Sequence, residues 1–507
     1  MKMKSNGAAV GRGLCAIVGA LLVSGIWPAS ASAQSQAAKP PSRPSEGQRQ
    51  NIVVIVADDL GWKDVGFHGS DIKTPNIDQL AAGGVRLEQF YAEPMCTPTR
   101  AALMTGRYPF RYGLQTAVIP AAGTYGLATD EWLLPQALAD AGYETAIIGK
   151  WHLGHADPKF WPRQRGFDYQ YGPLIGEIDY FDHKVQGVVD WYRNGKVVEE
   201  EGYSTKLLGD DALRLIEAHD TSRPLFLYLA FNAPHTPYQA PKEYLDRYSQ
   251  IDDPSRRAYA ASITAMDDQI GRVLGALDAK KMRNDTLILF MSDNGGTHDP
   301  MFSGAIADVS KVKIPCDNGP YREGKGTNYE GGTRVVAIAN WPGRIPAGVT
   351  VDEMIHVVDI YPTLVGLAGG STDKSKPLDG KDVWATLASG KPSPRTEVVY
   401  NIEPFRAAIR DGDWKLVWRT TLPSNVELFN LAQDPYEKNN LASDHPDKVA
   451  AMQQRLEALA KQAAKPLALI YMGQTAMKAN VPLLPTDETF YTDDDDDLTP
   501  PKIGNTH

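Results

Sequence analysis

Four short runs of apolar residues in the first 300 positions constrain the fold most, because each run ends in polar side chains. The first run, residues 51–57, reads NIVVIVA and precedes Asp58 and Asp59. Continuous runs of this length, rich in β-branched residues, are typical of strands buried on both faces of a parallel sheet. The other runs and the polar residues after them are 143–148 before Lys150 and His152, 224–231 before His235, and 286–291 before Asp293 and Asn294.

Segments with helical periodicity lie between these runs, at residues 132–141, 206–218 and 259–277. Strands that alternate with helices predict an α/β fold with a large, mostly parallel sheet flanked by helices. The functional site of such a sheet lies beyond the carboxyl ends of its strands. We therefore expect the polar residues that follow the four runs to form one site.

The pattern changes after about residue 379, where the chain shows short alternating strands at 398–402, 406–410 and 414–418. A helix is predicted at 446–463. We expect a catalytic domain over residues 51–378 and a smaller subdomain with an antiparallel sheet over residues 379–465.

The two ends of the chain have different compositions. Residues 1–33 combine Lys2, Lys4 and Arg12 with an apolar run and an Ala-Ser-Ala site, which predicts a signal peptide and a periplasmic or secreted protein without a membrane anchor. Residues 34–50 are predicted to be a flexible leader. Residues 466–507, with prolines and the acidic run 493–497, are predicted to be a solvated tail.

Charge and cysteine content exclude some classes of function. The net charge of −10 and the absence of a basic stripe with interleaved aromatic residues argue against nucleic acid as a partner. Without the signal peptide, Cys96 and Cys316 remain, too few for a disulfide framework. Cys316 is then a free thiol, or it forms a disulfide with Cys96.

The segment Cys96-Thr97-Pro98-Thr99-Arg100 has the pattern C-x-P-x-R and continues to Thr105-Gly106-Arg107. The pentapeptide alone is also compatible with a buried structural cysteine near a helix start. The complete motif resembles the signature of formylglycine-dependent sulfatases of the alkaline phosphatase-like superfamily. Residues 165–168 and 177–183 resemble stretches of the arylsulfatase B-like (N-acetylgalactosamine-4-sulfatase-like) branch. The resemblance covers about residues 50–465 and implies an alkaline phosphatase-like sandwich.

The resemblance implies that a maturase oxidises Cys96 to Cα-formylglycine, whose hydrate is the nucleophile. It also implies a calcium site formed by Asp58, Asp59, Asp293 and Asn294 together with position 96. Hard oxygen donors of this kind suit Ca²⁺ better than zinc. Taken separately, Asp58-Asp59 is also compatible with a helix N-cap pair, and Asp293-Asn294 with a tight turn.

The remaining catalytic roles are likewise implied by the resemblance. Arg100 would hold the formylglycine, and Lys150 and Lys325 would neutralise the sulfate oxygens. His235 would protonate the leaving oxygen. His152 would accept the proton whose removal releases sulfate and restores the aldehyde.

These residues predict a sulfuric ester hydrolase that releases inorganic sulfate, with a sulfated sugar favoured over an aryl sulfate as the substrate. The first alternative is a formylglycine-dependent phosphonate or phosphate ester hydrolase of the same superfamily. A two-metal phosphatase would need further ligands, for which His298 is the nearby candidate. The second alternative is a non-catalytic binder of sulfated glycans, should Cys96 not be matured.

Overall fold

The computed structural model describes residues 50–299 and 313–478, so the predicted signal peptide, most of the leader and the acidic end of the tail lie outside the described residues. Its largest element is a ten-stranded sheet with the order β13-β2-β12-β11-β1-β10-β4-β5-β8-β9. The five strands of its centre all run parallel. They are β11 (Thr286–Ser292), β1 (Asn51–Ala57), β10 (Leu225–Ala230), β4 (Glu144–Gly149) and β5 (Tyr169–Gly172).

Short strands extend both sides of this parallel centre, and most of them are antiparallel to their neighbours. They are β12 (Ala337–Asn340), β2 (Val85–Leu87) and β13 (Val349–Val351) on one side, and β8 (Tyr192–Arg193) and β9 (Lys196–Val197) on the other. The predicted large, mostly parallel sheet is therefore confirmed. The edge strands were not predicted because two to four residues are too few to show a strand pattern.

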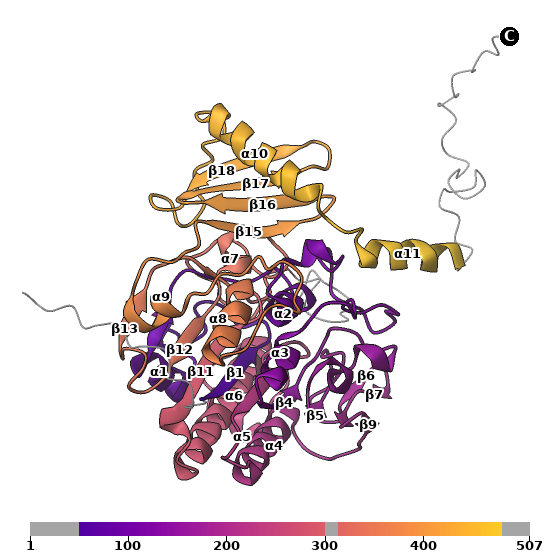
Figure 1. Cartoon of the computed structure of the whole chain (residues 1–507), viewed down its shortest axis with the longest axis vertical. Helices are drawn as coiled ribbons and strands as arrows, with labels where there is room; N and C mark the ends of the chain where they lie inside the picture. The colour runs from indigo at the N-terminus through magenta and orange to yellow at the C-terminus, as the bar shows by residue number, and fades with distance from the viewer. Residues whose placement is uncertain (1–49, 300–312, 479–507) are drawn as a thin grey trace, which may run out of the picture. The chain divides into compact units, whose positions relative to one another are not determined.

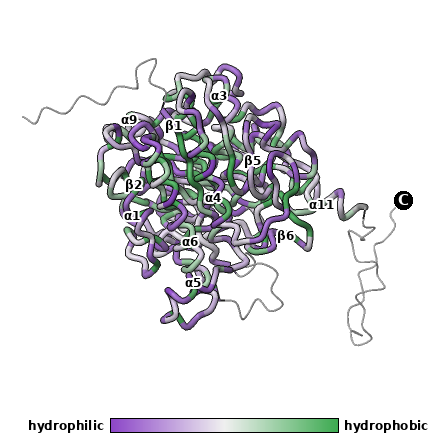
Figure 2. Tube along the Cα trace, turned by 90° about the horizontal axis from the view of Figure 1, so that it is seen from below, coloured by the Kyte–Doolittle hydropathy of each residue, from purple (hydrophilic) through white to green (hydrophobic). Residues whose placement is uncertain are grey.

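The centre of the sheet is buried on both faces, as its apolar runs indicate. Alternate side chains of β1 enter two separate cores: Ile52, Val54 and Val56 pack on one face, and Val53, Ile55 and Ala57 on the other. The strands at the centre appear in Figure 2 as hydrophobic stretches of the trace, inside the more polar segments. Residues of the helices α2, α3, α8 and α9 contribute to the first core, and residues of α1, α4, α5 and α6 to the second.

The three helical segments that the sequence predicted in this part of the chain are found in the structure. The segments at 132–141, 206–218 and 259–277 form α3, α4 and α6, and α6 begins earlier than expected, at Pro254, where Asp253 caps the helix. The bounds are α1 (Pro75–Ala82), α2 (Cys96–Thr105), α3 (Leu134–Asp140), α4 (Ser204–Ala218), α5 (Lys242–Asp246), α6 (Pro254–Ala279), α8 (Ile360–Leu367) and α9 (Trp384–Ser389).

A four-stranded antiparallel sheet follows, with α10 (Pro446–Ala460) beside it, as Figure 1 shows. Its strands are β15 (Glu397–Ile402), β16 (Arg406–Asp411), β17 (Trp414–Arg419) and β18 (Asn425–Asn430). The predicted antiparallel sheet is confirmed, and β18 is an addition. The first part of the segment predicted to be a solvated tail is α11 (Leu467–Lys478), whose Leu467 packs against the core that contains Ile52, Val54 and Val56.

Shorter elements connect these layers. Two-stranded sheets are formed by β3 (Phe90–Tyr91) with β14 (Ile355–His356) and by β6 (Lys184–Val185) with β7 (Val188–Val189). The short helices are η1 (Gly66–His68), η2 (Pro109–Arg111), η3 (Pro158–Phe160), η4 (Pro162–Arg165), η5 (Arg283–Asp285), α7 (Glu330–Thr333) and η8 (Val357–Asp359). Within the described residues, no helix has both the length and the apolar character needed to cross a membrane.

A buried polar cluster joins the four-stranded sheet to α7. Glu330 accepts hydrogen bonds from the hydroxyls of Tyr91 (2.9 Å) and Tyr400 (3.0 Å) and from Lys415 Nζ (2.9 Å). Lys415 also pairs with Glu437 at 2.8 Å, and neither Lys415 nor Glu330 is exposed to solvent. The ammonium group of Lys415 thus compensates two buried carboxylates, and Arg334 Nη1 lies 3.5 Å from Glu330 as a further cation.

We expect Lys415→Met to lower the free energy of unfolding by about 3–5 kcal/mol, because Glu437 would lose the cation it pairs with and Glu330 would keep only Arg334, at 3.5 Å. The midpoint of thermal unfolding should fall by several degrees. Lys391→Met, at an exposed lysine, is the matched control and should leave the midpoint in place. Equal midpoints for the two variants would contradict a structural role for the cluster.

Candidate active site

The register of the four central strands brings the predicted site residues together. Ala57 of β1 lies opposite Ser292 of β11, and Ala230 of β10 lies opposite Gly149 of β4. The strands therefore end level with one another, and the residues that follow them leave the sheet at the same edge. These residues are Asp58 and Asp59, Lys150 and His152, His235, and Asp293 and Asn294.

Two glycines permit the close approach of these strand ends. Gly149 has φ +112°, and a Cβ there would lie 1.8 Å from the carbonyl oxygen of Ala230. A Cβ at Gly295 would lie 1.8 Å from the carbonyl oxygen of Gly331. Only glycine fits at either position, so Lys150 and Asn294 are each placed by an adjacent glycine.

Cys96 is the first residue of α2, and its side chain points to the carboxyl edge of the sheet. The thiol donates to Asp58 Oδ1 at 3.4 Å and is 1% exposed. Burial and the charge of Asp293 raise the pKa of the Cys96 thiol well above its usual range. The unmodified side chain is therefore a neutral thiol and a poor nucleophile.

Three buried carboxylates alternate with three buried cations around Cys96. Lys150 Nζ lies 2.6 Å from Asp58 Oδ2, and Lys325 Nζ lies 2.7 Å from Asp59 Oδ2. Arg100 Nη2 lies 2.7 Å from Asp293 Oδ2, and its Nη1 donates to the carbonyl oxygen of Lys150 at 3.2 Å.

The pKa values of these groups reflect that arrangement. Burial alone would lower the pKa of Lys150, but the charge of Asp58 and other nearby groups raises it overall. Burial and the charge of Asp58 raise the pKa of Asp293 to about 6. The carboxylates thus repel one another despite their cations, which favours a further positive charge among them.

The donor set fits a calcium ion. Ligand atoms of Asp58, Asp59, Cys96 and His235 all lie within 4.8 Å of one another. Asn294 donates from Nδ2 to Asp59 Oδ1 at 2.7 Å, while its buried Oδ1 has no hydrogen-bond partner. A buried carbonyl oxygen without a partner beside three carboxylates is suited to a hard cation such as Ca²⁺.

Of the predicted metal-site residues, Asp58, Asp59 and Cys96 belong to this group, and His235 is an addition. Asp293 lies beside the group: its Oδ1 accepts from the backbone N–H of Asp59 at 3.3 Å, and its Oδ2 is engaged by Arg100. His298 is not part of this group, and within the described residues no second group of this kind is found. Cys96 and Cys316 are both free, so the alternative of a disulfide between them is wrong. The Cys316 thiol instead contacts Thr297 Oγ1 at 3.0 Å.

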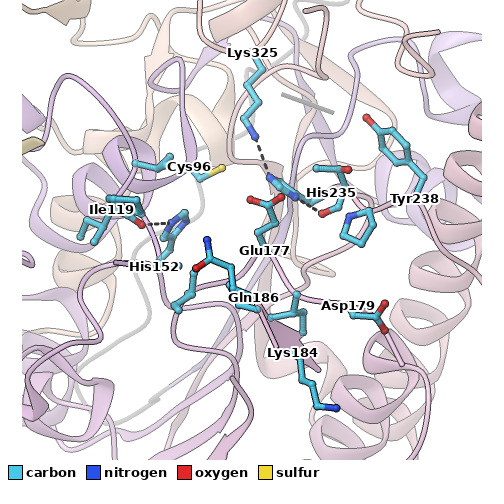
Figure 3. Close-up of a pocket in the computed structure, with 18 of the residues that line it drawn as sticks. Cys96, Ile119, His152, Glu177, Asp179, Lys184, Gln186, His235, Tyr238 and Lys325 are labelled. Carbon is cyan, nitrogen blue, oxygen red and sulfur yellow. Dashed lines mark hydrogen bonds between the residues drawn. The ribbon is translucent and has the colours of Figure 1, made fainter. Parts of the chain in front are cut away.

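The two histidines are held in different ways. His235 Nδ1 lies 2.7 Å from the carbonyl oxygen of Thr236, so its Nε2 accepts a hydrogen bond from Lys325 Nζ at 3.1 Å, as drawn in Figure 3. His152 Nε2 lies 3.1 Å from the carbonyl oxygen of Ile119, and its buried Nδ1 has no partner. Burial, followed by the charge of a neighbouring lysine, lowers the pKa of both rings. Both are neutral, and His152 Nδ1 is free to accept a proton.

These groups form the floor of a cavity of about 1110 Å³. Cys96, His152, His235 and Lys325 line it directly (Figure 3), whereas the buried Lys150 and Arg100 do not line it. One wall is apolar and consists of residues 118–121, and another contains Glu177, Lys184 and Gln186. The sequence predicted the floor but not these walls. Glu177 lies in a stretch that supported the branch resemblance, and Gln186 has no recognisable motif.

The chain is similar to known proteins over most of its length. The family model described as "Sulfatase" matches residues 50–371, and the model described as "N-sulphoglucosamine sulphohydrolase, C-terminal" matches residues 324–463. Arylsulfatase J of Mus musculus is 34% identical over 488 residues, covering 85% of this chain and 79% of that protein. N-acetylgalactosamine-6-sulfatase of Homo sapiens is 35% identical over 382 residues, covering 71% and 70%.

Solved structures show the same architecture. The crystal structure of Ps i-CgsB has a TM-score of 0.76 and 34% identity, and it covers 85% of this chain and 98% of its own. The same protein in complex with k-i-k-neocarrahexaose gives a TM-score of 0.76 at 33% identity. A sulfatase from Pseudoalteromonas sp., PsFucS1, gives 0.68 at 28% identity and covers 83% of this chain and 92% of its own. The predicted alkaline phosphatase-like α/β fold is confirmed by these likenesses.

Proposed function

Because the chain belongs to the sulfatase family and is a sulfuric ester hydrolase, we propose that it releases inorganic sulfate from a sulfated sugar. The observation that carries the proposal is the cavity: Lys325 places a cation on its floor for a sulfate group, and its 1110 Å³ exceed the needs of a single aryl ring. Two relatives support a sugar substrate by their printed names, one acting on N-acetylgalactosamine and one solved with a neocarrahexaose.

The finer assignment to the arylsulfatase B-like branch stays part of this proposal. It rests on residues 165–168 and 177–183 and is compatible with the similarity to arylsulfatase J. The periplasmic or secreted location also stays a proposal and rests on the pattern of residues 1–33. Fractionation of cells that express the full chain, with mass determination of the mature N-terminus, tests it.

We propose that formylglycine at position 96 and one calcium ion serve the reaction. Asp58, Asp59, Asp293 and Asn294 would hold the ion. When both groups are present, they supply a nucleophilic hydroxyl and positive charge at the sulfate oxygens. Arg100 orients the nucleophile from behind through its contacts with Asp293 and the backbone of residue 150.

The side chains on the floor carry out the proton transfers. The ammonium of Lys325 donates to His235 Nε2, so this pair holds a proton on the side of the cavity where the ester oxygen departs. His152 presents an unpartnered Nδ1 next to position 96 and accepts a proton there in the second half of the turnover. Lys150 and Lys325 compensate the negative charge of the sulfate group.

A substrate screen tests the proposed function. We expect the matured enzyme to release sulfate from sulfated oligosaccharides with a higher kcat/KM than from 4-nitrophenyl sulfate, and to hydrolyse phosphate and phosphonate esters more slowly than either. Ion chromatography of released sulfate and phosphate gives the readout. Faster hydrolysis of a phosphonate monoester than of any sulfate ester would overturn the proposal in favour of the alternative from the same superfamily.

We expect His235→Ala to slow sulfated sugars far more than aryl sulfates. A sugar alkoxide is a poor leaving group that needs a proton, and loss of a general acid costs about 10²–10⁴-fold where it is needed. A nitrophenolate leaves with little help, so its rate should fall less. The measurement is kcat/KM for both substrates, with His155→Ala as a control outside the cavity lining. Equal losses for the two leaving groups would show that the proton comes from elsewhere.

A further inference from the structure

One wall of the cavity carries a carboxylate without a partner. Glu177 is exposed to the cavity and, among the described residues, forms no hydrogen bond or ion pair. Asp179 also lines this wall, but its oxygens are occupied by the backbone N–H groups of Phe181 (2.8 Å) and Asp182 (3.0 Å) and by Gln239 Nε2 (2.7 Å). Glu177 is therefore the acidic side chain of this wall that is left to contact a substrate.

The nearest cation of the same wall does not compensate Glu177. Lys184 pairs with Asp182 at 3.5 Å and points away from the floor in Figure 3. Glu177, in contrast, extends toward the side of the cavity occupied by His235, and Gln186 extends toward His152. A carboxylate and an amide thus line the same cavity as Cys96, His152 and His235, where the scissile sulfate group is proposed to react.

The backbone that carries Glu177 is fixed against the floor. Gly176 has φ +113°, and a Cβ there would lie 2.3 Å from Cδ of Lys150, so the chain passes directly over the buried lysine. Ile175, which precedes Gly176, donates its N–H to Asp190 Oδ2 at 2.8 Å. Ile178, which follows Glu177, is 1% exposed. Glu177 is consequently presented by an ordered segment and not by an exposed loop tip.

The chemistry of a free carboxylate limits what can lie against it. It accepts hydrogen bonds from hydroxyl or amide groups, and it repels a second anion at the same place. Lys325 supplies positive charge at the inner end of the cavity, so one sulfate group is drawn inward while another beside Glu177 is disfavoured. The cavity therefore attracts an anion at its inner end and repels one beside Glu177, which discriminates between substrates with one and with two sulfate groups.

We propose that Glu177 is a specificity-determining residue that selects sugar rings with a free hydroxyl, and not a second sulfate, next to the scissile sulfate. This inference rests on the proposed function and deepens it, since it names singly sulfated rings as the substrate class. Gln186 assists as a neutral partner for ring hydroxyls. Rings farther from the floor are not restricted by Glu177 and can carry sulfate groups of their own.

The test compares a hexose monosulfate with the hexose disulfate that carries a second sulfate on the adjacent carbon. We expect the wild-type enzyme to favour the monosulfate by about 100-fold in kcat/KM, because like charges in contact oppose binding strongly. In Glu177→Gln, which keeps the shape and removes the charge, this preference should fall at least about tenfold. Glu201→Gln is the matched control, at an exposed glutamate that does not line the cavity, and should keep the wild-type preference.

A second variant tests the contact with the hydroxyl. Glu177→Ala should raise KM for the monosulfate about 10–100-fold while kcat changes less, because a lost hydrogen bond to a ring hydroxyl weakens binding of the whole ring. The ratio of KM for the monosulfate to KM for 4-nitrophenyl sulfate, which has no hydroxyl, separates this effect from a general loss of activity. Thermal unfolding midpoints verify that both variants fold.

The two possible failures differ in their results. If the wild-type enzyme cleaves the monosulfate but Glu177→Gln discriminates against the disulfate as strongly as the wild type does, the role of Glu177 is overturned and the proposed function stands. If the matured wild-type enzyme cleaves the aryl sulfate and no sugar sulfate, the proposed function itself is overturned, and this inference with it.

Discussion

Cys96→Ala is expected to reduce kcat for every sulfate ester by about 10⁴-fold or more, because alanine cannot be oxidised to the formylglycine whose hydrate is the proposed nucleophile. The fold should persist, since the thiol makes one weak contact, 3.4 Å to Asp58, and alanine fits at the first position of α2. Kinetics with a sugar sulfate and an aryl sulfate, together with the thermal unfolding midpoint, measure both parts of the expectation.

Cys316→Ala is the matched control for this variant, because it makes the same change at the other cysteine of the described chain. Cys316 lies beside Thr297 and does not line the cavity, so the variant should keep its activity. Mass spectrometry of the peptide that contains residue 96 should show formylglycine in this control and in the wild type. Substantial turnover by Cys96→Ala would contradict the proposed covalent mechanism.

Asp293→Asn is expected to remove calcium and to lower kcat/KM by about 10³-fold, since a bound metal ion supplies several kcal/mol of charge stabilisation in the transition state. The substitution keeps the shape of the side chain but removes the charge that also holds Arg100 at 2.7 Å. The unfolding midpoint should fall, because an ion that binds only the folded state stabilises it. Elemental analysis of the purified protein measures the calcium content.

Asp267→Asn is the control for the loss of a buried carboxylate outside the site. Asp267 accepts from the backbone N–H groups of Asn76 and Ile77 at the start of α1, and burial raises its pKa to about 6. This variant should lose some stability but retain about one calcium per chain. A full calcium content in active Asp293→Asn, or none in the active wild type, would contradict the proposed metal site.

Much of the fold could be predicted because the strands that form its centre are buried on both faces. Such strands must be apolar throughout, so their sequences are recognisable without knowledge of their neighbours, and residues 51–57 were predicted with the bounds that β1 has. The edge strands β2, β8, β9, β12 and β13 have two to four residues and are defined by the partner they pair with. Local sequence therefore could not reveal them.

The candidate site also has a part that the sequence could predict and a part that it could not. Cys96, Lys150, His235 and Asp293 follow recognisable motifs or strand ends, so their convergence at one edge could be predicted from parallel pairing alone. The sequence could not predict which side chains pair across the site, because pairing depends on side-chain directions in segments that are distant in the sequence. These pairs are Lys150 with Asp58, Lys325 with Asp59 and Lys325 with His235.

By itself, the sequence determined which residues form the floor, because the proposed nucleophile, metal ligands and cations are particular residue types in short motifs. Only the tertiary structure decided the shape and charge of the walls. Glu177 became a candidate for recognition because Gly176 packs on Lys150 and because Asp179 and Lys184 are engaged elsewhere. Contacts of this kind join segments that are distant in the sequence. Substrate recognition depends on the surface that these segments form together, which the order of residues in the chain does not show.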